Sequence, residues 1–381
     1  MPSRTRHLVV ALLALAAVAL AACAPVADGV TADRRRGGTP TTTTTTTLPP
    51  PPAPAAGPEF GFAQAGDPLW QSTASLNADF DRIKAAGGRW VRFDFHWPSI
   101  QPSGPSTFDW TTTDRAVSAA RSRGLEVLAI LTYTPPWARP AGTTDQHPPS
   151  NPSDYAAFAR AAVTRYAPQG VNAWEIWNEP NQNGFWQPKP DVAAYARLLK
   201  AVYPAIKAAD PGARVITGGL APAGGTLDYT APDGSRVSPW RFLKGIYDNG
   251  GKGSFDAVGH HPYTGMPFAP STLEAWNAFQ QTRDLHALMT SFGDGAKLVW
   301  GTEAGVWTGS SYQAVSEATQ AQYVREYVQI WKSWSFVGPF MYFSLRDRGT
   351  DPANPEHNFG LLRADRSEKP AMAAYEQALA A

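Results

Sequence analysis

The sequence predicts an α/β fold, a single (β/α)8 TIM barrel that follows an N-terminal targeting and linker region. Eight short apolar runs alternate with eight segments of helical pattern, and two of the runs end in a glutamate. Alternating strands and helices are typical of parallel sheets, and eight repeats are the number that closes this barrel. A chain of 381 residues has room for two average domains, but the unbroken alternation fits one barrel with lengthened loops.

The apolar runs give the expected strands in order, at residues 60–65, 89–95, 126–132, 173–178, 214–218, 257–260, 297–302 and 339–343. The expected helices are at residues 76–86, 114–123, 154–166, 192–208, 239–249, 273–292, 318–332 and 371–380. Ser75 is the expected N-cap of the first helix, Gly87 and Gly88 end it, and Gly124 ends the second. The loops after the strands are long and rich in proline, tryptophan and histidine. In such a barrel these loops carry the active site.

The N-terminus has the pattern of a secretory signal over residues 1–22. Arg4 and Arg6 precede an apolar stretch at 8–20, and small residues follow it. The Leu-Ala-Ala sequence before Cys23, the only cysteine, resembles the lipobox of bacterial lipoproteins. This resemblance implies lipidation of Cys23 and a lipid anchor on the outer face of the cell membrane. The alternative is an ordinary signal peptide cut in the same alanine-rich tract, which gives a secreted protein.

Residues 23–58 form a low-complexity segment with runs of threonine and proline. Such a segment cannot bury a core, and its prolines favour extended polyproline II, so we expect a semi-rigid linker. The barrel then occupies residues 59–381. Basic and acidic residues nearly balance, 33 against 32, and no basic stripe is present, so we expect no nucleic-acid partner. We also expect a monomer.

Two glutamates carry the prediction of function. Glu179 follows the fourth apolar run in the sequence Trp-Glu-Ile-Trp-Asn-Glu, and Glu303 follows the seventh in Val-Trp-Gly-Thr-Glu. Hydrolysis of a glycosidic bond needs one protonated carboxyl group and one ionised carboxylate on either side of the bond. Strands 4 and 7 lie roughly opposite each other in a barrel of eight. The sequence therefore predicts a glycosidase.

Both motifs resemble the retaining glycoside hydrolases of clan A, with families 39 and 5 closest. The resemblance implies that Glu179 is the acid/base and Glu303 the nucleophile of a double displacement. It also implies a carbohydrate substrate, an extracellular or cell-envelope polysaccharide or oligosaccharide, and no metal or organic cofactor. Two other readings stay open: a surface carbohydrate-binding protein on the same barrel, and a metal-dependent hydrolase. The second needs clustered histidine and aspartate at strand ends, a pattern that the seven histidines do not form.

The same resemblance implies four further site residues. Asn178 donates to the sugar 2-hydroxyl, Arg92 on the second strand keeps the nucleophile ionised, and His261 and Tyr263 line the catalytic subsite. Each has a structural alternative. Asn178 can cap the strand end, Arg92 can pair with Asp94 or another barrel residue, and His261 and Tyr263 can belong to the core or a loop.

Aromatic side chains near strand ends are candidate platforms for sugar rings, whose C–H faces stack on aromatic rings. The candidates are Trp97, Trp137, Trp177, Trp186 and Trp307. We expect Trp137 and Trp307 to contact substrate. Many clan members have a tryptophan at strand 8, whereas this chain has only Tyr342 or Phe343 there; we expect Tyr342 to take that place.

Overall fold

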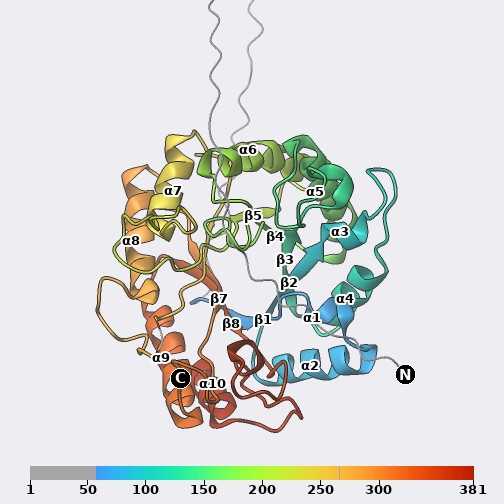
Figure 1. Cartoon of the computed structure of the whole chain (residues 1–381). Coiled ribbons are helices and arrows are strands. Elements are labelled where there is room, and N and C mark those ends of the chain that lie inside the picture. Colours follow the sequence, from blue (N-terminus) through green and yellow to red (C-terminus); the bar gives the residue numbers. More distant parts are fainter. Residues whose placement is uncertain (1–56, 266) are drawn as a thin grey trace, which may run out of the picture. The chain divides into compact units, whose positions relative to one another are not determined.

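The computed structural model describes residues 57–265 and 267–381. Eight parallel strands in this part of the chain form a barrel, seen along its axis in Figure 1. They are β1 (Phe60–Ala63), β2 (Trp90–His96), β3 (Glu126–Thr132), β4 (Ala173–Ile176), β5 (Arg214–Thr217), β6 (Val258–His260), β7 (Val299–Ala304) and β8 (Val337–Phe343). The strand order is β5-β4-β3-β2-β1-β8-β7-β6, and parallel bridges between Ile216 and Ala257 and between Leu220 and His260 join the two ends. The predicted fold class is confirmed.

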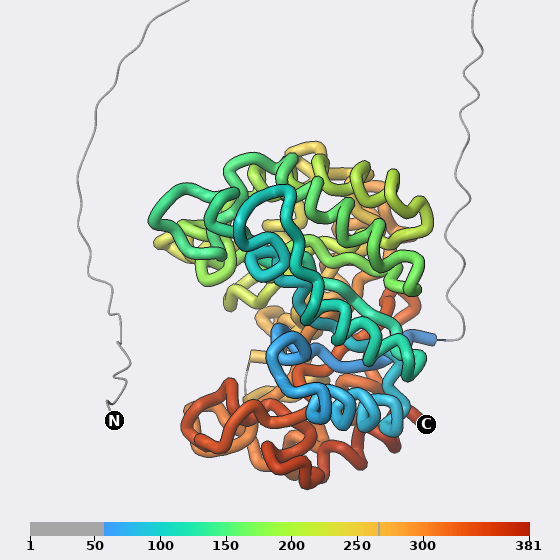
Figure 2. The backbone as a smooth tube through the Cα atoms, turned by 90° about the vertical axis from the view of Figure 1, so that its right-hand side faces the viewer, coloured from blue at the N-terminus to red at the C-terminus, as the bar shows by residue number. Residues whose placement is uncertain are grey.

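A ring of helices covers the strands (Figure 1). They are α1 (Asp67–Trp70), α2 (Thr73–Ala85), α3 (Trp97–Ile100), α4 (Thr111–Arg121), α5 (Pro152–Tyr166), α6 (Val192–Ala209), α7 (Pro239–Asp248), α8 (Ala278–Ser291), α9 (Glu317–Ser333) and α10 (Pro370–Ala380). Figure 2 shows α2 beside the C-terminal segment, where Arg82 of α2 pairs with Glu376 of α10 at 2.8 Å. The first and last helices of the predicted set therefore meet and complete the ring.

Three helix starts differ from the predicted ones by three residues or more. Helix α4 starts at Thr111 instead of residue 114. The cap of α2 is Ser72, whose hydroxyl accepts a hydrogen bond from the Ser75 amide at 3.2 Å. Helix α8 starts at Ala278 instead of residue 273, because the Asn277 side chain caps it and also donates to two loop carbonyls. The four-residue helices α1 and α3 were not predicted.

Strand alternation separates two sets of side chains. On β2, Val91, Phe93 and Phe95 pack in the core between strands and helices, whereas Trp90 packs in the cluster inside the barrel, against Trp300 of β7 with ring centroids 5.3 Å apart. Arg92 comes two residues after Trp90 and so points inward as well. The interior is thus apolar near the start of the strands and polar toward their carboxyl ends.

The predicted signal peptide, Cys23 and the linker up to residue 56 lie outside the described residues. Among the helices of the described part, none has the length and apolar character needed to cross a membrane.

Candidate active site

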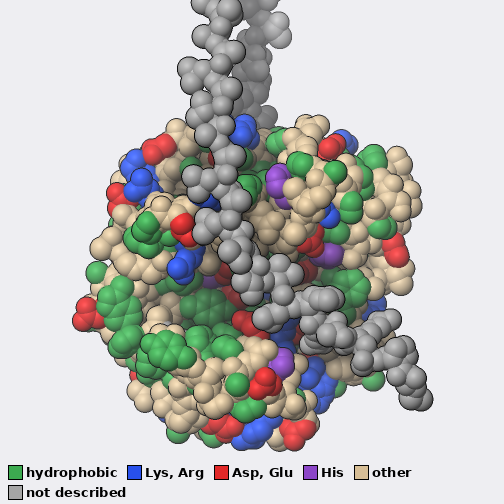
Figure 3. Space-filling view, viewed as in Figure 1, with side chains coloured by type: hydrophobic (Ala, Val, Ile, Leu, Met, Phe, Trp, Pro, Cys, Tyr) green, Lys and Arg blue, Asp and Glu red, His purple; other side chains and the backbone are tan. Residues whose placement is uncertain are grey.

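A cleft of about 850 Å³ lies at the carboxyl ends of the strands. Figure 3 shows the face seen in Figure 1, where acidic and hydrophobic side chains both reach the surface near the centre. Loops after strands from both halves of the barrel line the cleft. Its lining includes six of the residues predicted from the sequence, namely Arg92, Asn178, Glu179, Tyr263, Glu303 and Trp307.

Arg92 joins these residues into one network. It is 1% exposed, and its Nε donates to Glu175 at 2.6 Å, Nη1 to Glu303 at 2.8 Å and Nη2 to Asn178 at 2.9 Å. Burial works against its charge, but the carboxylates of Glu175 and Glu303 outweigh burial and raise the pKa of Arg92. Two roles were predicted for Arg92 as alternatives, contact with the proposed nucleophile and a structural ion pair in the barrel. The guanidinium has both contacts, because it pairs with Glu303 and with the buried Glu175. Asp94 forms no ion pair with it among the described residues.

Glu175 is a member of this network that the sequence analysis did not identify. It is fully buried on β4, and its second oxygen accepts hydrogen bonds from the Gly219 amide at 2.7 Å and the Thr302 hydroxyl at 3.0 Å. A buried charge is tolerated only when it is paired and hydrogen-bonded. Its position could have been noticed in the sequence, because a glutamate inside an apolar strand needs a cation in the barrel interior as its partner.

Glu303 lies on β7 and has a partner on each oxygen. Tyr263 donates its hydroxyl to Oε1 at 2.6 Å and Arg92 donates to Oε2 at 2.8 Å. Burial, followed by the charge of Glu303, raises the pKa of Tyr263 well above its ordinary value, so the phenol keeps its proton and remains a donor. Both partners stabilise Glu303 as a carboxylate.

Glu179 reaches the cleft through a strained turn after β4. Trp177 and Glu179 have positive φ angles of 71° and 45°, a left-handed conformation that costs a residue with a side chain about 1–3 kcal/mol. Packing holds the turn in place. The Trp177 indole donates to the Phe185 carbonyl at 2.6 Å, and the Glu179 amide donates to the Gly219 carbonyl at 3.1 Å.

His261 links Glu179 to Arg92. Its Nδ1 lies 2.7 Å from Oε1 of Glu179, and its Nε2 lies 3.2 Å from Nη2 of Arg92. A guanidinium only donates, so Nε2 accepts and Nδ1 carries the hydrogen that is donated to Glu179. Burial, followed by the charge of Arg92, lowers the pKa of His261 well below its ordinary value, so the ring is neutral. Gly219 permits this packing, because a Cβ there would overlap the imidazole.

The two glutamates differ in electrostatic environment although they lie close together. Burial, followed by the charge of Glu303, raises the pKa of Glu179 well above its ordinary value. An oxygen of Glu179, an oxygen of Glu303 and a nitrogen of His261 all lie within 4.8 Å of one another. Three such groups resemble a metal-ligand set, but the Arg92 guanidinium 2.8 Å from Glu303 places a positive charge where a cation would bind.

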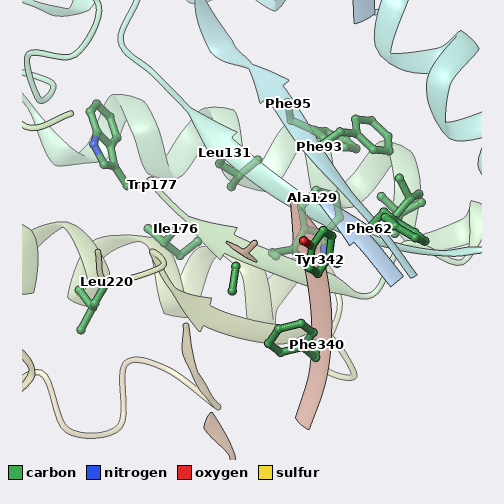
Figure 4. Close-up of a cluster of buried hydrophobic side chains, with 14 of the residues drawn as sticks. Phe62, Phe93, Phe95, Ala129, Leu131, Ile176, Trp177, Leu220, Phe340 and Tyr342 are labelled. Carbon is green, nitrogen blue, oxygen red and sulfur yellow. The ribbon is translucent and has the colours of Figure 1, made fainter. Parts of the chain in front are cut away.

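Three residues that were predicted to contact substrate do not line the cleft. His261 is fully buried and meets the cleft only through Glu179. Trp137 packs against Trp97 and donates to the Gln101 carbonyl at 2.7 Å. Tyr342 points out of the barrel into the buried cluster drawn in Figure 4, which also labels Phe340. Since side chains alternate along β8, the next residue, Phe343, faces inward and lines the cleft. Of the remaining candidate platforms, Trp307 lines the cleft, whereas Trp97, Trp177 and Trp186 are buried.

Sequence reasoning also assigned no site role to several charged residues that line the cleft, among them Asp94, Arg236, Arg348 and Glu356. Asp94 had a detectable signal, because it shares the inward face of β2 with Arg92. The other three charged residues lie on long loops, where no sequence periodicity indicates which way a side chain points; they are Arg236, Arg348 and Glu356.

Comparison with known proteins identifies the family of this chain. A family model described as cellulase (glycosyl hydrolase family 5) matches residues 53–338, which include both glutamates. A comparison with curated protein sequences gives no match.

Solved glycoside hydrolases share the fold. A family 39 glycoside hydrolase from the gut symbiont Bacteroides cellulosilyticus WH2 superposes with a TM-score of 0.66 at 26% identity, covering 85% of this chain and 64% of that one. This chain therefore spans less than two thirds of that structure. A monomeric beta-xylosidase from Caulobacter crescentus CB15 superposes with a TM-score of 0.62 at 23% identity, and the match covers 84% of this chain and 69% of that one. The GH5_18 protein of Streptomyces cattleya superposes with a TM-score of 0.61 at 19% identity, and the match covers 86% of this chain and 80% of that one. With the family model matching most of its length, the chain belongs to glycosyl hydrolase family 5, the cellulase family.

Proposed function

We propose that this protein is a glycosidase that retains anomeric configuration and cleaves a polysaccharide or oligosaccharide by double displacement, with Glu303 as nucleophile and Glu179 as acid/base. The observation that supports this most directly is the separation of the two carboxyl groups. Retaining enzymes hold them about 5–5.5 Å apart, whereas inverting enzymes leave room for a water molecule between carboxylate and sugar. Oxygens of Glu179 and Glu303 within 4.8 Å of each other fit the shorter spacing.

In the first step, a Glu303 oxygen attacks the anomeric carbon while the bond from that carbon to the leaving oxygen breaks. Glu179 gives its proton to the leaving oxygen. Because His261 donates to Oε1 of Glu179, the transferable proton is on Oε2. Asn178 contributes through its amide: Arg92 occupies Oδ1, which leaves the Nδ2 hydrogens directed to other acceptors such as a sugar 2-hydroxyl.

In the second step, Glu179 is a carboxylate and takes a proton from water. The water oxygen attacks the anomeric carbon, the bond to Glu303 breaks, and Glu303 returns to its ionised state between Arg92 and Tyr263. His261 stabilises the ionised form of Glu179 during this step by hydrogen bonding. Proton NMR of the first product tests the stereochemistry, because a product of inverted configuration would contradict a covalent intermediate.

We expect Glu179→Ala to separate substrates by their leaving group. The rate of oligosaccharide hydrolysis should fall by about 10²–10⁴-fold, which is the contribution of a general acid. The transfer of the same sugar from a 2,4-dinitrophenyl glycoside to Glu303 should be much less affected, because this leaving group needs no protonation. Wild-type kcat/KM should fall as pH rises through the raised pKa of Glu179, and this basic limb should disappear in the variant. Azide should restore turnover on the aryl glycoside and give a glycosyl azide; an equal loss on both substrates would contradict the assignment.

From the sequence pattern at its N-terminus, we propose that the enzyme is exported and lipidated on Cys23. Two acyl chains are enough for stable anchoring. In a bacterial host, the full chain should partition with membranes and incorporate labelled palmitate, and Cys23→Ser should lose both properties while its activity on an aryl glycoside is unchanged. A wild-type product that is soluble and cleaved elsewhere in the alanine-rich tract would indicate an ordinary signal peptide.

A further inference from the structure

The sequence contains two Asn-Gly pairs, Asn183-Gly184 and Asn249-Gly250, and all four residues are exposed. Glycine has no side chain to cover its backbone nitrogen, so this nitrogen can attack the side-chain carbonyl carbon of the preceding asparagine. The two groups are neighbours in one chain, which favours the closure of a ring. The sequence makes the two pairs equivalent, and their hydrogen bonds in the structure make them different.

Hydrogen bonds protect the second pair from this reaction. Asn249 follows α7, and its Nδ2 donates to the Gly245 carbonyl at 2.8 Å. The Gly250 amide donates to the Tyr247 carbonyl at 2.9 Å. The side-chain amide and the attacking nitrogen are therefore both bonded to the end of the helix. Both bonds must break in a local opening of the chain before the ring can close.

The first pair has no such protection. Asn183 and Gly184 are the central residues of a turn that is closed by the Phe185 amide, which donates to the Gln182 carbonyl at 3.1 Å. In the described part of the chain, neither the Asn183 side chain nor the Gly184 amide forms a hydrogen bond. A Cβ at Gly184 would meet no atom within 4 Å. The Gly184 nitrogen can therefore reach the Asn183 side chain without losing a hydrogen bond of its own.

This turn borders the cleft. Gln182 and Phe185, on either side of the Asn-Gly pair, both line it. Nε2 of Gln182 lies 3.4 Å from Oε2 of Glu179, and the Phe185 carbonyl accepts the hydrogen bond from Trp177 that holds the strained turn after β4. A longer chain between residues 183 and 184 would therefore displace two residues that support the position of Glu179.

We propose that Asn183 is a site of spontaneous deamidation, and that its isoaspartate product lowers activity at the adjacent cleft. The Gly184 nitrogen bonds to Cγ of Asn183, and the bond from Cγ to Nδ2 breaks. The hydrogen of the Gly184 amide leaves with Nδ2 as ammonia, and a succinimide ring remains. The modification itself does not depend on the proposed function, whereas its effect on activity rests on that function.

Water opens the ring in one of two ways. Attack at Cγ breaks its bond to the Gly184 nitrogen and gives aspartate with an ordinary backbone. Attack at the backbone carbonyl carbon of residue 183 breaks the original peptide bond and gives isoaspartate. In isoaspartate the chain continues through the side chain and is one methylene longer, so the turn between Gln182 and Phe185 cannot keep its present form.

Ageing of the purified full chain in mildly alkaline buffer tests the proposal. Peptides are analysed by mass spectrometry, and protein isoaspartate methyltransferase labels the isoaspartate. Asn183 should convert at least about tenfold faster than Asn249, because two hydrogen bonds must first open at the second pair. Activity on an aryl glycoside that the fresh chain cleaves should fall in proportion to the isoaspartate at residue 183.

Three variants locate the effect. Asn183→Gln would need a larger ring, so it should stay unmodified and keep its activity on ageing, whereas Asn249→Gln is the matched control and should age as the wild type does. Gly184→Ala covers the attacking nitrogen and should slow conversion at Asn183, and its methyl group has room.

Equal conversion at both asparagines, or none at Asn183, would overturn the proposed site. Activity that persists while isoaspartate accumulates, or that is lost equally in Asn183→Gln, would overturn its effect on the cleft. If the fresh wild type cleaves no glycoside, the proposed function fails, while the mass spectra still decide whether Asn183 is modified.

Discussion

Glu303→Gln is expected to lower kcat by at least about 10⁴-fold on every substrate that the wild type cleaves, because an amide cannot replace the nucleophile of a covalent mechanism. Wild-type enzyme incubated with a 2-deoxy-2-fluoro glycosyl fluoride should gain the mass of one sugar on the peptide that contains Glu303. The variant should gain none. An adduct on another carboxylate, or near-normal turnover in the variant, would contradict the assignment.

The fold should tolerate this change. The new amide can accept from Arg92 through its oxygen and donate to the Tyr263 hydroxyl through its nitrogen, so both partners of Glu303 remain hydrogen-bonded. We therefore expect the midpoint of thermal unfolding to stay close to that of the wild type. A loss of activity with an unchanged midpoint then reports on chemistry and not on folding.

Arg92→Met is expected to damage both stability and catalysis. It removes the cation from Glu175, which stays buried, and breaking a buried pair in this way costs about 3–5 kcal/mol of the free energy of unfolding. It also removes a donor from Glu303, Asn178 and His261, and the loss of one preorganised donor at the reacting charge lowers kcat by about 10²–10³-fold. Urea denaturation and kinetics on an aryl glycoside measure the two effects.

A double variant separates these two effects. Arg92→Met combined with Glu175→Gln leaves no unpaired buried charge, so it should recover much of the lost stability while activity stays low. Arg92→Lys is the companion control, since it keeps a positive charge but lacks the planar fork that reaches four acceptors at once. If the double variant is as unstable as the single one, the unpaired Glu175 is not the cause; if Arg92→Met is fully active, Arg92 does not support the nucleophile.

The barrel could be predicted from the sequence because each strand is a short apolar run with a clear end, and each long helix repeats its apolar positions over several turns. Helices α1 and α3 have four residues each, too few for periodicity to appear. The position of Glu179 and Glu303 in the cleft was predictable, because one follows strand β4 and the other lies at the end of strand β7.

The partners inside the barrel were harder to predict. Glu175 meets Arg92 only because β2 and β4 curve around a common interior, a relation that no local pattern records. Tyr342 and Phe343 are adjacent aromatic residues, and the sequence does not indicate which of the two faces inward. Trp137 follows a strand as Trp307 does, but its loop directs it toward Trp97.

The left-handed backbone conformation of Glu179 has a consequence for its evolution in a protein that no longer needs it for catalysis. A glycine at this position would adopt the same φ without the roughly 1–2 kcal/mol steric penalty of a side chain. In a lineage that had stopped cleaving sugars, replacing this glutamate by glycine would therefore cost nothing in activity and would remove this backbone penalty. Mutation and drift would then remove it among the first changes. A glutamate that stays in this conformation is accordingly a sign of continued selection for chemistry, which argues against a barrel that only binds.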